Sequence, residues 1–549
     1  MASLPAGAYR AILAAAMVIG AAVILHQNRS GIFFLDELVH LYNSPDLDLR
    51  YVFEPVNGHL GITPKLVYKL VLETFGADYT AFRILHVIAV MLSAGVFYAV
   101  AERRVGPPPA LAAALVLVFF GAAYPHFVIP VGFGIFVCIA AALGALLALE
   151  REDRIGDALA CVLLLLSIAT YTVGLAFAVG VAVSVLIRRD RAARAWIFLV
   201  PLTLYAAWWV WASGSEASSE TQTELSNILL LPNFAAESLA VVIGALVGLG
   251  YDFIHAPFQG DVGSGRVLAA AAVVLLAIRL RRGNLPASLW VSLSIAIAYW
   301  ALGAVAVEPG FRGPESSRYL YPGAIIVLLI ATDAARGLRV SPGALTLVAV
   351  ACAISVAANL ALLRDGGRQF RVYSAIAKAQ FGAIELTRDR VDPDFDPVDE
   401  TRDAATVSTP AGVYLRSADR YGAVGFSEGE LRRQSNNVRG RADTMLAAAL
   451  GVDAAPARRE ATEDCRRASP NVPDGPVLVE LAPGGATLEA EGVSAGSVAL
   501  SRFADSPQVA LGELAPGEPV RIRVPTDSGE QPWTAAVTGT ESVLVCAAA

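Results

Sequence analysis

Long apolar segments recur along the first two thirds of the chain, and short polar segments separate them. A membrane-crossing helix needs about 20 mostly apolar residues, and eleven segments approach or reach that length. They occupy residues 8–26, 81–100, 109–125, 131–149, 158–172, 173–187, 195–212, 265–280, 286–307, 319–335 and 342–362. The pattern therefore predicts a polytopic α-helical membrane protein with about eleven spans.

One further apolar segment, 228–254, lacks the continuity of a regular span. Pro232, Asn233 and Glu237 interrupt its start, and three glycines lie near its end. Irregular backbone at membrane depth is tolerated where protein or a wet cavity covers it. We therefore expect a broken or re-entrant segment on the outer side of the membrane. A twelfth regular span is the alternative.

Clusters of arginine determine the predicted orientation, because cytoplasmic loops are enriched in Lys and Arg. With eleven crossings and a cytoplasmic N-terminus, all the clusters fall on the cytoplasmic side: Arg103–Arg104, 150–154, 188–194, 279–282 and 335–339. We therefore expect a multi-pass protein of the plasma membrane. The first outer loop, 27–80, and the region after residue 362 are then extracytoplasmic.

The composition agrees with this class. Hydrophobic residues make up 55% of the chain and charged residues 17%, whereas soluble proteins carry about 25% charged residues. The net charge of −7 gives no sign of nucleic-acid binding. Because the cytoplasmic loops carry little but anchoring charge, we expect any chemistry on the extracytoplasmic face.

The region after the transmembrane domain (1–362) divides into two parts and forms an extracytoplasmic α+β region. Residues 363–457 carry apolar positions at helical spacing and end in an Ala/Pro-rich linker near 453–457. Residues 458–549 contain short alternating runs separated by Gly, Pro, Asp and Ser. This spacing is typical of a small β-sandwich.

Two features of the predicted sandwich leave alternatives open. Cys465 and Cys546 can pair if the region is extracytoplasmic, or they can remain free thiols. A carbohydrate-binding module is one interpretation of the sandwich, but Phe503 and Trp533 are its only large stacking aromatics. A structural or docking module is the better interpretation.

The first outer loop opens with two adjacent carboxylates. Asp36 and Glu37 directly follow the first apolar segment. A carboxylate there can be a solvated end-of-helix charge, but Trp, Tyr, Lys and Arg are the usual interface anchors. If residues 34–43 are helical, His40 shares a face with Asp36 at i, i+4 spacing. Such a pair can tune the proton affinity of the carboxylate.

Further polar residues follow in the same loop. Glu54, Asn57 and His59 lie within six residues. An Asn-Gly turn explains Asn57, but it requires neither the glutamate nor the histidine. Residues 64–75 are predicted as an amphipathic helix lying on the membrane. Lys65 on that helix can contact a lipid phosphate, and simple solvation is the alternative.

The last outer loop, VEPGFRGPESSRYLYP, supplies cations. Arg312 and Arg318 lie on the outer side, where the distribution of charge does not favour them, and Arg binds phosphate in a bidentate manner. Tyr319 follows at the interface. The alternative is an aromatic belt with a snorkelling arginine. His126, after the third span, faces the same side.

The pattern LDELVHLYNSPDL…FEPVNGHLGITPKLVYKLVLETFG, followed by FRILHVI, resembles actinobacterial-type members of the GT-C superfamily of membrane glycosyltransferases. The resemblance covers about residues 1–362 and is motif-like only in the first outer loop. It implies a polyprenyl-phosphate-linked sugar donor, an inverting transfer to a glycan or lipid acceptor, and an acidic catalytic base at Asp36.

Elementary chemistry fits this implication. A phosphate-linked sugar already has a good leaving group, so a carboxylate that removes the acceptor proton suffices as the base. Glu37 and His59 are expected to shape or polarise the site. His40, Glu54, Asn57, Lys65, Arg312, Arg318 and Tyr319 are the expected substrate and lipid-phosphate contacts.

No cofactor is required by this scheme, and the sequence contains no nucleotide-binding loop. A divalent cation is an option, because some relatives hold one near the acidic pair. Asp36 and Glu37 would then be its ligands, but no spacing specifies a metal.

A non-enzymatic membrane transporter or scaffold for lipid-linked cell-envelope intermediates is the alternative function. An ion-coupled transporter should carry ionisable residues near the middle of its spans, and these spans are almost free of them. A scaffold built on a degenerate transferase fold would have the same pattern.

Overall fold

The computed structural model of the chain describes residues 5–56, 58–214, 225–249, 263, 265–308, 312–338, 341–397, 410–458, 465–473, 475–491 and 493–547. These residues belong to two compact units. The first unit comprises Met1–Arg29, Asp46–Val71 and Thr80–Phe370. The second unit comprises Ser30–Pro45, Leu72–Tyr79 and Arg371–Ala549. The C-terminal part of the second unit therefore begins at Arg371, later than the predicted boundary at 362. The second unit also contains two segments of the loop 27–80, Ser30–Pro45 and Leu72–Tyr79.

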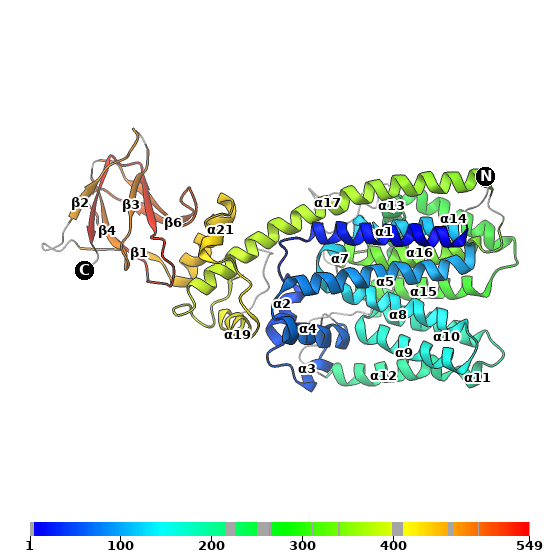
Figure 1. Cartoon of the computed structure of the whole chain (residues 1–549). Helices are drawn as coiled ribbons and strands as arrows, with labels where there is room; N and C mark the ends of the chain where they lie inside the picture. The colour runs from blue at the N-terminus through cyan, green and yellow to red at the C-terminus, as the bar shows by residue number, and fades with distance from the viewer. Residues whose placement is uncertain are drawn as a thin grey trace. The chain divides into compact units, whose positions relative to one another are not determined.

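Helices form the first unit, and its long helices lie side by side as a bundle (Figure 1). Three helices also contribute to the second unit: α4 and α17 end in it, and α5 begins in it. The helices are α1 (Ala6–Gln27), α3 (Leu49–Phe53), α4 (Ile62–Phe75), α5 (Tyr79–Val105), α6 (Pro107–Val118), α7 (Tyr124–Val128), α8 (Phe133–Leu149), α9 (Arg154–Thr170), α10 (Val173–Leu186), α11 (Arg191–Arg194), α12 (Trp196–Ala212), α13 (Leu231–Leu246), α14 (Gly265–Arg281), α15 (Ala287–Val305), α16 (Leu320–Ala335) and α17 (Pro342–Leu386). Short 3-10 turns join some of them: η1 (Gly121–Ala123), η2 (Pro130–Gly132), η4 (Leu225–Leu230) and η5 (Ser317–Tyr319).

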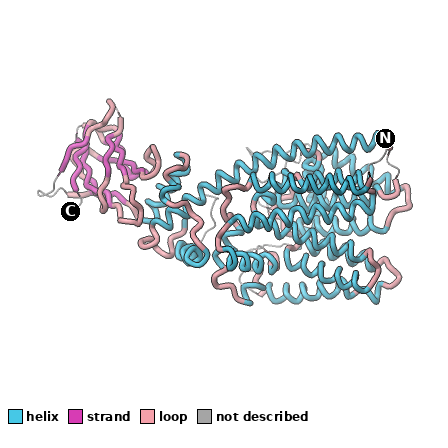
Figure 2. The backbone as a smooth tube through the Cα atoms, viewed as in Figure 1, coloured by secondary structure: helices cyan, strands magenta, loops and turns pink. Residues whose placement is uncertain are grey.

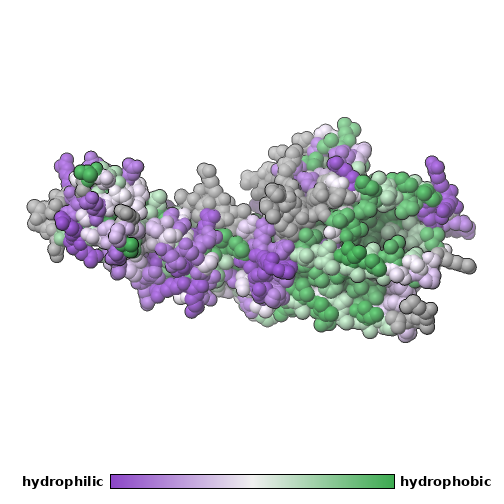
Figure 3. All heavy atoms as spheres, turned by 90° about the horizontal axis from the view of Figure 1, so that it is seen from above, coloured by the Kyte–Doolittle hydropathy of each residue, from purple (hydrophilic) through white to green (hydrophobic). Residues whose placement is uncertain are grey.

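The eleven predicted spans all correspond to helices, which confirms the polytopic helical fold. Eight helices within the described parts of the chain are long and apolar enough to cross a membrane, and α10 and α12 are shorter apolar helices. Apolar side chains cover much of the visible surface of the bundle, whereas the helices and sandwich of the second unit show mostly polar side chains (Figure 3). Such a wide apolar surface on helices is what a bilayer solvates.

The segment expected to be broken or re-entrant, 228–254, contains η4 and α13 in its described part. The C-terminal end of α13 lies against α17, inside the span expected at 342–362: Asn359 donates to the carbonyl of Ala245, and Ser355 donates to that of Leu246. Both side chains are buried. A helix end needs partners for its last carbonyls, and here buried side chains supply them. Leu225–Leu246 is nevertheless one of the eight segments long and apolar enough to cross a membrane, so the broken segment and the twelfth span both stay predictions.

A buried ion pair joins three helices of the bundle. Arg104 at the end of α5 donates to Asp333 of α16 at 2.7 Å, and Ser292 of α15 donates to the same carboxylate. Removing one partner of a buried pair costs about 3–5 kcal/mol. The pair lies at the ends of α5 and α16 and joins them to α15 through one carboxylate oxygen, which is a structural role and gives no support to ion-coupled transport.

Helices at the start of the second unit enclose a group of aromatic rings. The helices of the second unit include the second half of α17 together with α2 (Asp36–Asn43), α19 (Ala411–Tyr421), α20 (Glu428–Leu431) and α21 (Asn436–Leu450). The Tyr414 ring of α19 stacks on Phe381 of α17 at 4.5 Å and meets Tyr42 of α2 edge-on at 6.4 Å. The hydroxyl of Tyr414 donates to Glu385. These contacts hold the helix of the acidic pair, α2, within the second unit.

Within the described residues, nine strands form the predicted sandwich of two antiparallel sheets (Figure 2), in the orders β1-β7-β4-β9-β2 and β3-β8-β5-β6. Alternation along β3 shows why the strands form: Val477 and Val479 are buried, while Leu478 and Glu480 are exposed. The strands are β1 (Asp453–Pro456), β2 (Cys465–Ala468), β3 (Val477–Glu480), β4 (Ala486–Glu491), β5 (Gly496–Ser501), β6 (Val509–Leu514), β7 (Val520–Arg523), β8 (Thr534–Thr538) and β9 (Ser542–Ala547).

The boundary predicted between the helical segment and the sandwich is wrong. The Ala/Pro-rich stretch 453–457, expected as a linker, contains strand β1, which pairs with β7. Asp443 of α21 also accepts hydrogen bonds from the backbone of Arg502, Phe503 and Ala504. Helices and sandwich are therefore joined by a buried carboxylate, and residues 363–457 and 458–549 do not form separate domains.

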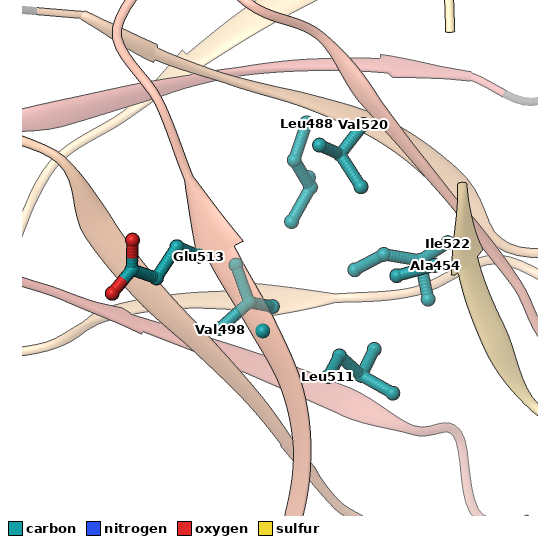
Figure 4. Close-up of a pocket in the computed structure, with 8 residues that line it drawn as sticks. Ala454, Leu488, Val498, Leu511, Glu513, Val520 and Ile522 are labelled. Atoms are coloured by element: carbon teal, nitrogen blue, oxygen red, sulfur yellow. The ribbon is translucent and has the colours of Figure 1, made fainter. Parts of the chain in front are cut away.

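The sandwich offers little for a sugar ligand. Trp533 and Phe503 are both buried, and the Arg502 guanidinium lies over their rings. Side chains of both sheets line a gap of only about 10 Å³, which leaves room for about one water (Figure 4). These observations favour the structural or docking module over a carbohydrate-binding one.

Cys465 and Cys546 face each other across β2 and β9 and form a disulfide. We expect the purified protein to carry this bond, because oxidising conditions prevail outside the cytoplasm. Mass spectrometry of a non-reduced digest should find the linked peptide. Removing both cysteines should lower the stability of the second unit by about 2–5 kcal/mol. Recovery of both cysteines as alkylated free thiols from unreduced protein would contradict the pairing and the predicted location.

Candidate functional site

The predicted site residues lie in two groups, one in each unit. Asp36, Glu37 and His40 lie on α2 of the second unit. The first unit holds Glu54, His59, Lys65, Arg312, Arg318 and Tyr319. Asn57 lies outside the described residues. The sequence therefore named residues that the fold divides between two bodies.

The two adjacent carboxylates have opposite environments. Asp36 is exposed and Glu37 is fully buried. One oxygen of Glu37 accepts hydrogen bonds from the Phe34 amide at 3.1 Å and from the Tyr79 hydroxyl at 2.8 Å. Glu37 therefore anchors the start of α2, while Asp36 presents an exposed carboxylate that can accept a proton.

The backbone enters α2 through an unusual turn. Leu35 has φ +48° and ψ −121°, and a non-glycine residue rarely adopts positive φ. Such strain persists where the surroundings hold it, and the buried Glu37 carboxylate bonded to Phe34 is one such restraint. The turn places Asp36 at the first position of the helix, where the helix dipole favours the charged carboxylate.

His40 does not share the exposure of Asp36. It lies one turn further along α2 and is buried, and its carbonyl accepts hydrogen bonds from the amide and hydroxyl of Ser44. A role for His40 in tuning Asp36 stays a prediction.

In the first unit, His59 lies in a tight turn against the loop between α9 and α10. Val56 and His59 exchange two backbone hydrogen bonds across Gly58, which has φ +77°. The His59 ring bonds through Nδ1 to the Thr172 hydroxyl and lies 3.9 Å from the Tyr171 ring, centroid to centroid. The turn that carries His59 is thus packed on the two residues between α9 and α10.

His59 also shares its surroundings with the two predicted arginines. Burial lowers its pKa to about 3, and the positive charges of Arg312 and Arg318 act in the same direction. The histidine is therefore neutral near pH 7 and offers a hydrogen bond rather than a charge. We call His59, Arg312, Arg318, Tyr171 and Thr172 the basic cluster.

The arginines of the basic cluster have the chemistry to bind an anion. The side chain of Arg312 is mostly buried, and its ion pair with Glu308 is long, at 3.9 Å. Arg318 lies in η5, directly before α16. Guanidinium groups bind phosphate through paired hydrogen bonds, so the cluster has the chemistry of a phosphate site.

Tyr319 has a packing role. Its carbonyl accepts a hydrogen bond from the Tyr299 hydroxyl, and its ring meets Phe234 of α13 edge-on at 5.8 Å. These contacts fix the end of η5, which carries the neighbouring Arg318.

Lys65 has contacts other than those expected. Its side chain is 1% exposed, and its ammonium group donates to the carbonyls of Tyr51, Val52 and Glu54 at the end of α3. An ammonium group has three donors, and all three are engaged. We therefore remove Lys65 from the phosphate contacts: it caps α3, and Glu54 supplies one of its acceptors and an ion pair with Arg50.

The sequence analysis did not identify Tyr171 and Thr172, which lie next to His59. Tyr171 and Thr172 fall at the junction of two predicted spans, 158–172 and 173–187, which left no loop between them. In the structure Tyr171 is extended and interrupts the helix between α9 and α10. The two polar side chains at the outer end of an apolar run were the signal that could have located them.

The acidic pair does not fit a divalent cation well. Glu37 already uses one oxygen for two donors, and its burial separates it from the exposed Asp36. Within the described ranges, no group of three or more His, Cys, Asp or Glu side chains is arranged to hold a metal. We derive no step through a metal ion.

Comparison with solved structures gave three matching chains, two of which are described below. No protein-family model and no curated protein sequence matches the chain. The crystal structure of ArnT from Cupriavidus metallidurans bound to undecaprenyl phosphate is 14% identical, covers 74% of this chain and 85% of that chain, and has a TM-score of 0.45. The cryo-EM structure of arabinosyltransferase EmbB from Mycobacterium smegmatis is 13% identical, covers 100% of this chain and 65% of that chain, and has a TM-score of 0.34.

The first of these structures contains undecaprenyl phosphate, and the second is described as an arabinosyltransferase. At these identities and TM-scores the likeness carries no argument about substrate or mechanism, which have to be argued from the residues of this chain.

The buried Lys65 predicts a pH-dependent stability. Burial lowers its pKa from 10.5 to about 8, against the opposing charge of Glu54. Between these values the unfolded chain binds more protons than the folded one, so stability should rise with pH across this window. We expect the melting temperature of the wild type to rise from pH 8 to 10 relative to that of Lys65→Met, followed by intrinsic fluorescence in detergent. Parallel curves for the two proteins would contradict the assigned environment.

Proposed function

We propose that the protein is a GT-C-like glycosyltransferase that moves a sugar from a polyprenyl-phosphate donor to an extracytoplasmic glycan or lipid acceptor. The observation that carries the proposal is the contrast between the two adjacent carboxylates. An exposed Asp36 at the start of α2 stands beside a buried, hydrogen-bonded Glu37. Such a pair combines a group that can take a proton with a group that holds it in place.

Asp36 acts as the general base. The acceptor hydroxyl gives its proton to the Asp36 carboxylate, and its oxygen forms a bond to the anomeric carbon of the donor sugar. The bond between that carbon and the phosphate oxygen breaks, and polyprenyl phosphate leaves with the electron pair. A single displacement of this kind inverts the anomeric configuration, and a positioned carboxylate contributes about 10²–10⁴-fold to the rate.

The basic cluster binds the phosphate of the donor. Arg312 and Arg318 stabilise the charge that grows on the departing phosphate, and the neutral His59 donates one hydrogen bond without competing for a proton. The depressed pKa of His59 supports this division of roles, because a histidine with a pKa of about 3 is a poor general base near pH 7.

Substitution of Asp36 tests the base. We expect Asp36→Asn to reduce transfer by about 10²–10⁴-fold, because the amide cannot take the proton, while donor binding persists. The assay uses purified protein in lipid nanodiscs, a panel of polyprenyl-phosphate sugars and a membrane-derived acceptor fraction.

Asp46→Asn is the matched control, since Asp46 is an exposed carboxylate in the same loop. Unchanged transfer by Asp36→Asn would remove Asp36 from the mechanism. If wild-type protein transfers none of the sugars and still binds the lipid-linked intermediates, the scaffold alternative is the better description.

Substitution of Arg318 tests the phosphate contact. A lost charge-assisted hydrogen bond should raise the KM for the donor by about tenfold or more. Arg318→Lys should recover part of the loss, since it keeps the charge but not the paired geometry. The measurement is the donor dependence of the initial rate. A change confined to the KM for the acceptor would place the donor phosphate elsewhere.

A further inference from the structure

A second cavity lies in the first unit, between α3 and the end of α12. Its volume is about 660 Å³, and its lining consists of Leu49, Arg50, Phe53, Trp208, Trp211 and Gly214. None of these residues belongs to the acidic pair or to the basic cluster. The cavity is thus a separate feature of the first unit.

The walls of the cavity are apolar and aromatic, and they are fixed in place. Trp208 donates its ring N–H to the carbonyl of Phe53 at 2.7 Å, which joins α12 to α3 across 155 residues of sequence. Leu49 and Phe53 are four residues apart on α3 and expose 79% and 43% of their surfaces. A tryptophan of an ordinary aromatic belt keeps its N–H for headgroups or water, so this arrangement is a built wall.

An apolar stripe on α12 continues from the cavity along the helix. Val200, Leu204 and Trp211 are exposed large apolar residues at helical spacing, and Trp208 lies between them on the same face. The helix α12 is a shorter apolar helix of the first unit. A hydrocarbon chain can therefore lie on the stripe and enter the cavity at its outer end.

One charge stands at the cavity. Arg50 is the cation among the described lining residues, its side chain is 78% exposed, and it pairs with Glu54 at 3.1 Å. A sugar ligand would need several hydrogen-bonding groups, which this lining does not provide. An anionic headgroup can reach Arg50 from the solvent side and share it with the half-buried Glu54, since surface ion pairs are worth only about 0–1 kcal/mol.

We propose that this cavity binds an anionic phospholipid of the surrounding membrane, with its phosphate on Arg50 and an acyl chain along the α12 stripe. We choose a phospholipid as the ligand of this cavity, rather than the polyprenyl-phosphate donor, because the proposed function places the donor phosphate at the basic cluster. The choice of lipid therefore rests on the proposed function. The site itself does not depend on transferase activity.

Native mass spectrometry of the full-length protein in detergent tests the site, with titration of phosphatidylglycerol, phosphatidylcholine and polyprenyl phosphate. We expect Trp211→Ala and Arg50→Gln each to weaken the tightest phosphatidylglycerol binding by about tenfold. Arg50→Gln should affect phosphatidylglycerol more than phosphatidylcholine, because only the former has a net charge. Trp211→Phe should retain binding, which separates loss of the wall from misfolding.

Two controls match these variants. Trp290→Ala removes an exposed tryptophan of α15, and Arg154→Gln removes an exposed cation at the start of α9. Equal phosphatidylglycerol affinity in Trp211→Ala, Arg50→Gln and the controls would overturn the site. Displacement of phosphatidylglycerol by polyprenyl phosphate at a lower concentration would overturn the assigned lipid. Because Asp36→Asn should leave lipid binding unchanged, failure of this proposal and failure of the transferase proposal are distinguishable.

Discussion

A bilayer provides no hydrogen-bond partner for a backbone amide, and this constraint governs the first unit. It makes every crossing segment a helix, and it permits an interruption only where other groups satisfy the freed carbonyls. The end of α13 shows the rule at work, since buried Ser355 and Asn359 take up its last carbonyls. Polar side chains that can do chemistry are therefore displaced to the segments between the helices.

The need for hydrogen-bond partners also divides those polar side chains into two classes. A buried polar group needs partners, and the groups that find theirs within the fold become structural: Glu37 holds the start of α2, Lys65 caps α3, and Asp443 joins α21 to the sandwich. A second class comprises the exposed Asp36 and the arginines that share the surroundings of His59. The proposed base and phosphate contacts come from this second class.

Two outcomes show how far sequence reasoning reached. Periodicity and length located the helices and the strands, because burial against lipid or a sheet imposes a period on apolar residues. Sequence reasoning failed at 453–457, where an Ala/Pro-rich run was predicted as a linker but contains strand β1. An edge strand needs few large side chains once a neighbour such as β7 pairs with it. Sequence reasoning also missed Tyr171 and Thr172, since a break of two residues between apolar runs leaves the hydropathy pattern almost unchanged.

The sequence by itself determined that the chain is a polytopic membrane protein with a β-sandwich at its end, and it predicted the chemistry-bearing residues in the segments 27–80 and 308–322. Local composition and spacing suffice for those conclusions. Only the tertiary structure decided that Glu37 is buried while Asp36 is exposed, that Lys65 is a helix cap, and that His59 shares the field of Arg312 and Arg318. Burial and pairing between residues far apart in the chain decide whether a polar group is structural or available, and no local pattern encodes them.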